Sequence, residues 1–288
     1  MNTKTLLERD VASAHVDAPS PTRALRTKAR ARLRASKVAV EATPRVHDAR
    51  EAHDGAALKR IRVWDLPTRL FHWLLVAAVS IAVITGEIGG SLMEVHGIAG
   101  LFIVGLVTFR LVWGIVGSTN ARFLSFAPTP GRLKAYLRGR WQGHGHNPLG
   151  ALSVFALLAL LGAQAGTGLF GNDDIAFTGP LYALVEESFA ATLTGLHRQL
   201  AYVLLGLLAL HVVAIFAYLH FRKKNLIKPM VTGYKEVRSG ASASKGGWLA
   251  LVLALSAAAA AVYFASGAAF KHPAPVAAPV QQSSAPAW

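Results

Sequence analysis

The sequence predicts an all-α membrane protein: a four-helix transmembrane bundle with a fifth transmembrane helix. Three observations lead to this fold class. Of the 288 residues, 53% are hydrophobic and 16% are charged, whereas about 25% of residues are charged in an ordinary soluble domain. Five apolar stretches are long enough to cross a bilayer, and the loops between them alternate between acidic and basic.

Each apolar stretch is close to the ~20 residues that a helix needs to cross the hydrocarbon core. We expect the spans at residues 70–88, 96–116, 148–170, 195–221 and 247–268. The last stretch is rich in alanine and less apolar, so an amphipathic tail is the alternative to a fifth span there.

The charges in the loops predict the orientation. Loops 89–95 and 171–194 contain acidic residues but no Lys or Arg. Loop 117–147 has five basic residues and no acid, and segment 222–246 has seven basic residues against Glu236. Because basic loops stay on the cytoplasmic side, we expect a cytoplasmic N-terminus.

Composition outside the spans predicts the domain organisation. We expect a basic, disordered cytoplasmic extension at 1–60, a four-helix domain at 61–235, a linker with the fifth helix at 236–268, and a disordered Pro/Ala-rich tail at 269–288. The extension lacks the apolar core of a secretory signal, and a basic surface helix at 27–40 is an alternative within it. The net charge of +15 is spread over the extension and two loops, so we expect membrane lipid and no nucleic acid as its partner.

The histidines carry the chemistry. Cysteine is absent, which excludes disulfides, iron–sulfur clusters and thioether-linked haem on this chain. Five of the eleven histidines lie in or at the ends of spans: His72, His96, His197, His211 and His220. Ionisable residues in a membrane indicate function, although a histidine that hydrogen-bonds a neighbouring helix is the alternative for any one of them. His144 and His146 form either a surface metal site or part of a solvated loop.

The spacing of the span histidines predicts two pairs. His197 and His211 are fourteen residues apart, which is ~21 Å along a helix and within about 40° of the same face. The alternating helix directions put His72 at the level of His211, near the inner face. They put His96 at the level of His197, near the outer face.

Two imidazoles at each level suit haem, because the macrocycle supplies four nitrogens and the protein adds two axial ligands. Zinc would require three or four protein ligands at each level. We therefore predict that the haem iron ligands are the pairs His72/His211 and His96/His197. His220 lies about half a turn from His211 and is expected to be an interfacial residue.

Arginines and glycines accompany these histidines. Arg69, Arg110 and Arg198 are candidates for pairing with haem propionates, with snorkelling to lipid headgroups as the alternative. Six glycines on the second and fourth predicted spans permit either close helix contact or entry of a flat macrocycle: Gly97, Gly100, Gly105, Gly114, Gly195 and Gly206.

Several motifs resemble one known family. Residues 62–73, RVWDLPTRLFHW, resemble the opening signature of the bacterial cytochrome b561 family, which includes the cytochrome b subunits of Ni–Fe hydrogenases. The sequence GLHR at 195–198, then His211, NLI at 225–227 and MVTG at 230–233 resemble that family's fourth helix and exit. The resemblance covers about residues 60–235 and implies a di-haem core with the same four histidines as ligands.

The resemblance also implies a function. It indicates a di-haem b-type cytochrome of a respiratory chain in the bacterial inner membrane, which transfers electrons between quinone or quinol and a partner redox protein. The partner is expected to be a periplasmic c-type cytochrome or a hydrogenase-like subunit, with Asp173 and Asp174 as a docking point or simply part of a solvated loop. The chain would then be an electron-transfer subunit of an oxidoreductase complex. A haem-free transporter or proton-relay subunit is the alternative function.

Overall fold

The computed structural model describes residues 58–141, 143, 145–175, 177–238 and 240–270, together with Arg30, Arg32 and Arg34. The chain divides into two units, Met1–Ala57 and Leu58–Trp288. In the first unit the three arginines are helical and exposed. The rest of the predicted surface helix at 27–40 lies outside the described residues, as do residues 271–288 of the C-terminal tail and His15, His47, His53, His144 and His272.

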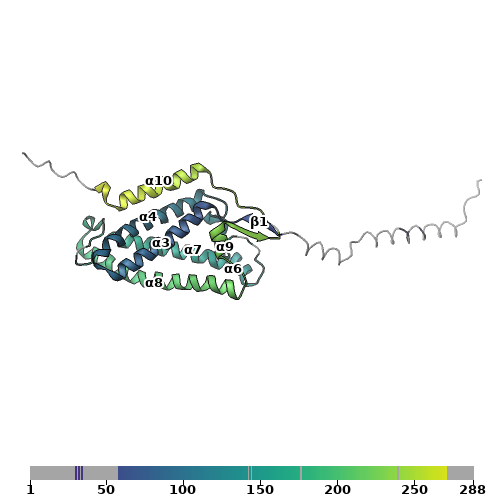
Figure 1. Cartoon of the computed structure of the whole chain (residues 1–288), viewed down its shortest axis with the longest axis horizontal. Coiled ribbons are helices and arrows are strands. Elements are labelled where there is room, and N and C mark those ends of the chain that lie inside the picture. The colour runs from purple at the N-terminus through teal and green to yellow at the C-terminus, as the bar shows by residue number, and fades with distance from the viewer. Residues whose placement is uncertain are drawn as a thin grey trace, which may run out of the picture. The chain divides into compact units, whose positions relative to one another are not determined.

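Among the described residues of the second unit, five helices are long and apolar enough to cross a membrane. They are α3 (Leu66–Ile88), α4 (Met93–Val116), α7 (Pro148–Gly168), α8 (Glu187–His220) and α10 (Trp248–Ala265). A short 3₁₀ turn, Gly90–Leu92, precedes α4. The predicted all-α membrane fold is therefore confirmed, with a fifth helix of spanning length (Figure 1).

Local capping signals place the start of two helices. The side chain of Asp65 accepts a hydrogen bond from the Thr68 amide at 3.1 Å, and Pro67 follows in the first turn of α3. Asn147 caps α7 in the same way through the amide of Gly150 at 2.7 Å. An Asp or Asn cap followed by proline is a strong helix start, so α3 begins before the apolar stretch does.

Helix α8 is longer than its apolar stretch. It has 34 residues, which corresponds to ~51 Å at 1.5 Å per residue, whereas the hydrocarbon core is about 30 Å thick. Its first turn holds Glu187, and a carboxylate there is favoured by the helix dipole. The unbroken helix keeps His197 and His211 on one axis.

Helix α4 lies at the centre of the unit. It packs against α3, α7 and α10, while α8 packs against α7 (Figure 1). The largest fully buried side chain is Trp113 of α4. Helix α10 approaches α4 closely at Gly105, where an added Cβ would lie 2.9 Å from the Val262 side chain. Exposed apolar side chains along α3, α8 and α10 provide the surface that lipid contacts.

Short elements close the end of the bundle where α4 stops. They are α5 (Phe123–Phe126), α6 (Pro130–Leu137), α9 (Ile227–Thr232) and an antiparallel sheet of β1 (Lys59–Arg62) with β2 (Tyr234–Val237). The sheet was not predicted, and β1 begins inside the segment expected to be disordered. It forms because Ile61, Val63 and Val237 bury a small apolar cluster of their own. There are also two 3₁₀ turns: Tyr182–Leu184 precedes α8, and Ala268–Phe270 follows α10.

Candidate functional site

Helices α3, α4, α7 and α8 together line a cavity of about 420 Å³. We name it the outer cavity, after the predicted orientation. His96 of α4 and His197 of α8 both line it, and Arg198 stands at its wall. Its volume lies within the 300–1,000 Å³ that is usual for cofactor and ligand sites.

The two imidazoles of the outer cavity face each other. Their ring centroids are 6.0 Å apart and their planes are nearly perpendicular, at 84°. Two imidazoles bound to one metal from opposite sides would have a similar spacing: about 2 Å for each metal–nitrogen bond plus roughly 1 Å from each nitrogen to its ring centre gives ~6 Å. The pair fits bis-axial ligation of a haem iron.

Hydrogen bonds to neighbouring helices orient both rings. Nδ1 of His96 lies 2.8 Å from the carbonyl of Ala82, and Nδ1 of His197 lies 2.9 Å from the carbonyl of Gln164. A carbonyl only accepts, so Nδ1 carries the proton in each ring and Nε2 keeps its lone pair. The Gln164 amide, 3.2 Å from Nε2 of His197, donates to that lone pair. Both Nε2 atoms are therefore in the form that a metal requires.

The other predicted pair lies on α3 and α8. His72 of α3 and His211 of α8 are both half-buried, and they are close enough to interact electrostatically. Nδ1 of His72 is buried and has no hydrogen-bond partner among the described residues. His220, at the end of α8, is exposed and its ring packs edge-on against Phe221.

The three arginines have different surroundings. Arg198 is exposed at the wall of the outer cavity. Arg69 donates from Nη1 to the carbonyl of Val231 and so joins α3 to α9.

Arg110 is buried in α4. It donates to the carbonyl of Ala121 at 3.0 Å, and its guanidinium lies 4.7 Å from the centre of the Phe123 ring. The observed contacts of Arg69 and Arg110 join elements of the protein, while propionate pairing remains a prediction for all three arginines.

The glycines separate into groups. Gly105 and Gly114 permit contact with α10 and with the Phe123 ring, respectively. Gly97 and Gly100 line the outer cavity. Gly195 and Gly206 of α8 have no described atom within 4 Å of an added Cβ. Close contact is therefore observed at Gly105 and Gly114, whereas entry of a macrocycle remains a prediction for Gly97 and Gly100.

The acidic loop after α7 is ordered around Asp173. One carboxylate oxygen of Asp173 accepts from the amides of Ile175 at 3.0 Å and Phe177 at 2.8 Å. The Phe177 ring then lies against Gly97, where an added Cβ would be 2.9 Å away. Phe177 and Asp173 both line the outer cavity, so this loop forms its end wall.

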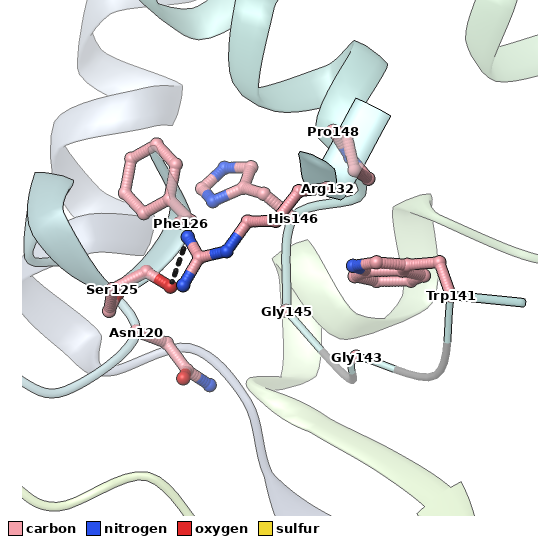
Figure 2. Close-up of a pocket in the computed structure, with 9 residues that line it drawn as sticks. All are labelled: Asn120, Ser125, Phe126, Arg132, Trp141, Gly143, Gly145, His146 and Pro148. Atoms are coloured by element: carbon pink, nitrogen blue, oxygen red, sulfur yellow. Dashed lines mark hydrogen bonds between the residues drawn. The ribbon is translucent and has the colours of Figure 1, made fainter. Parts of the chain in front are cut away.

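A second cavity, of about 250 Å³, lies in the loop region between α4 and α7. Figure 2 shows Arg132 reaching across it, where the guanidinium donates to the carbonyl of Ser125 at 3.2 Å. His146 lines the same cavity. The centre of its ring lies 4.5 Å from the centre of the Trp64 ring and 4.3 Å from the centre of the Phe126 ring.

The prediction of a solvated loop is wrong for His146. Its Nδ1 is buried without a partner in the described part of the chain. Burial, together with the charge of Arg110, lowers the pKa of His146 to about 3. The loop folds back onto the end of the bundle, which the basic composition does not indicate. Across the described residues there is no cluster of three or more His, Cys, Asp or Glu that could hold a bare metal ion.

Comparison with known proteins gives one match. The sequence model of a family described as prokaryotic cytochrome b561 matches residues 63–233, which is more than half of the chain. Searches among curated proteins and among solved structures found no match. The matched family implies haem b binding and electron transfer in a membrane. The match starts beside the cap of α3 and ends at the turn after α9, so it contains all four predicted histidine ligands. The chain belongs to the prokaryotic cytochrome b561 family.

Proposed function

We propose that this protein is a di-haem b-type cytochrome that transfers electrons between quinone or quinol and a partner redox protein. The observation that supports it best is the pair His96 and His197, which face each other at 6.0 Å across a cavity inside the four-helix bundle. The second pair, His72 and His211, would hold the other haem.

The residues of the chain bind and orient the cofactor. A haem held by each histidine pair would supply reversible one-electron exchange, and with both imidazoles of a pair bound to its iron no position would be left for oxygen. The carbonyls of Ala82 and Gln164 hold the outer imidazoles with Nδ1 protonated, so that each Nε2 keeps the lone pair that a metal binds. Arg198 is the arginine best placed to pair with a propionate of the outer haem, because it stands at the cavity wall.

The length of α8 sets the separation of the two sites. His197 and His211 belong to one helix, so fourteen residues separate their levels by ~21 Å. Electrons that pass between the two sites would thus travel from one side of the membrane towards the other. A single haem site could not provide this path.

Loop charges support the proposed surroundings of the protein. Basic residues gather in the loop between α4 and α7 and after α8, and this supports a cytoplasmic position for that end of the bundle. The opposite end, with Asp173, would face the periplasm of a bacterial inner membrane. A periplasmic c-type cytochrome or a hydrogenase-like subunit is the proposed partner there, and the quinone pool supplies the other reactant.

Haem analysis of the full-length protein tests the proposal. After purification in detergent, we expect the absorption bands of a reduced b-type cytochrome, two haems per chain and two components in a redox titration. The variant His220→Ala is a matched control on the same helix, because His220 is exposed and outside both pairs. It should retain both haems. A colourless protein, or one haem per chain in the wild type, would contradict the di-haem assignment.

A further inference from the structure

The two imidazoles of the outer cavity are held by the same local arrangement on two different helices. On α3, His96 bonds to the carbonyl of Ala82, and Gly86 follows four residues later. On α7, His197 bonds to the carbonyl of Gln164, and Gly168 follows four residues later. In each case the ring of a histidine from a neighbouring helix bonds to a backbone carbonyl and lies against a glycine, and the glycine follows the carbonyl residue by one helical turn.

The imidazole rings occupy the space that a side chain would take at these two glycines. A Cβ added at Gly86 would lie 2.9 Å from Nδ1 and 3.0 Å from Cε1 of the His96 ring. A Cβ added at Gly168 would lie 2.8 Å from Cε1 and 3.1 Å from Nδ1 of the His197 ring. The residue at position i+4 of a helix lies beside the carbonyl of residue i. A methyl group there would therefore push the imidazole away from the carbonyl it bonds.

We infer that Gly86 and Gly168 are positioning residues that fix the planes of the two outer imidazoles nearly at right angles. This inference rests on the proposed function, in which these imidazoles are the axial ligands of the outer haem. Each carbonyl sets the direction of Nδ1–H, and each glycine lets the ring reach it. Nδ1 of His72 has no such partner in the described structure, so the inner site lacks this arrangement on that side.

Two properties of the outer haem follow from the arrangement. A hydrogen bond from Nδ1–H to a carbonyl makes the imidazole a stronger base towards iron. Stronger ligands stabilise the ferric state, which lowers the reduction potential. In addition, perpendicular imidazole planes give low-spin ferric haem a strongly anisotropic EPR signal, whereas parallel planes give a rhombic one.

The variants Gly86→Ala and Gly168→Ala test the inference in the full-length, haem-loaded protein. We expect each to raise the reduction potential of the outer haem and to shift its EPR signal towards the rhombic form. The inner haem should keep its potential and its signal. Because alanine is the better helix former, weakening of the helix cannot explain these changes.

Gly166→Ala and Gly162→Ala are matched controls on α7, since no described atom lies within 4 Å of an added Cβ at either position. Both should retain the wild-type potentials and signals. If the wild type holds two haems and the outer signal is unchanged in both test variants, the positioning role is refuted and the ligand assignment stands. Equal effects on both haems would also refute it. A wild type without haem would instead refute the proposed function.

Discussion

Asp65 connects the start of α3 to the C-terminal end of α4 through Trp113. One carboxylate oxygen of Asp65 caps α3 through the Thr68 amide at 3.1 Å, and the other accepts from the indole nitrogen of Trp113 at 3.0 Å. Arg110 lies one turn before Trp113 on the same helix. All three side chains are buried. Asp65 belongs to the sequence signature that opens the cytochrome domain, and its contacts give it a structural role there.

We predict that Asp65→Ala destabilises the protein by about 3 kcal/mol. The loss of a helix cap costs about 1 kcal/mol, and an unpaired buried indole N–H costs a further ~1–3 kcal/mol. Thermal unfolding in detergent measures the change. In a Trp113→Phe background the same substitution should cost less, since the indole donor is already gone. Equal costs in both backgrounds would mean that the Asp65–Trp113 hydrogen bond contributes nothing.

Hydropathy and helix arithmetic predicted a large part of this molecule. The positions of the spans follow from composition over about 20 residues. The pairing of His96 with His197 follows from the rise per residue and the alternating helix directions. The motif that resembles the family signature lies at the start of the first span and contains both the helix cap Asp65 and the predicted ligand His72. The resemblance therefore indicates the same span and the same histidine as the hydropathy and the helix arithmetic.

The remaining features depend on contacts between distant parts of the chain. Strands β1 and β2 pair residues such as Arg62 and Tyr234, and neither strand has a local apolar pattern long enough to indicate a sheet. His146 was expected in solvent because its neighbours are polar or glycine, yet Trp64 and Phe126 enclose its ring. Gly86 and Gly168 were not identified either, since a glycine in an apolar helix has many possible roles until its neighbour is known.

The proposed ligand pairs predict which haem each histidine variant loses. We expect His211→Ala to reduce the haem content from two per chain to about one, with the outer haem retained, because His211 and His72 serve the inner site. His197→Ala should remove the outer haem instead. Haem quantification together with EPR distinguishes the two products. If His211→Ala and His197→Ala lose the same haem, the pairing is wrong.

The buried Nδ1 of His146 predicts a dependence of stability on pH. Its pKa is lowered from 6.5 to about 3 in the folded protein, so the unfolded chain binds a proton at a pH where the folded chain does not. Stability from this residue is therefore present above pH 6.5 and is lost progressively as the pH falls from 6.5 towards 3. His146→Phe removes the titration while keeping an apolar ring. The Tm difference between wild type and variant should thus change across this interval, and a constant difference would contradict the prediction.

The contact between Gly105 and Val262 predicts how α10 is attached to the family core. Helix α10 lies beyond the matched residues 63–233, yet an added Cβ at Gly105 would be 2.9 Å from Val262. We expect Gly105→Ala to destabilise the protein by ~1–3 kcal/mol through overpacking, measured by thermal unfolding in detergent. The second substitution Val262→Ala should restore part of that loss by providing space. Gly206→Ala is the control on α8, with no described atom within 4 Å of its added Cβ, and it should leave the Tm nearly unchanged. If Val262→Ala fails to restore stability to Gly105→Ala, α10 is not held against α4 by this close approach.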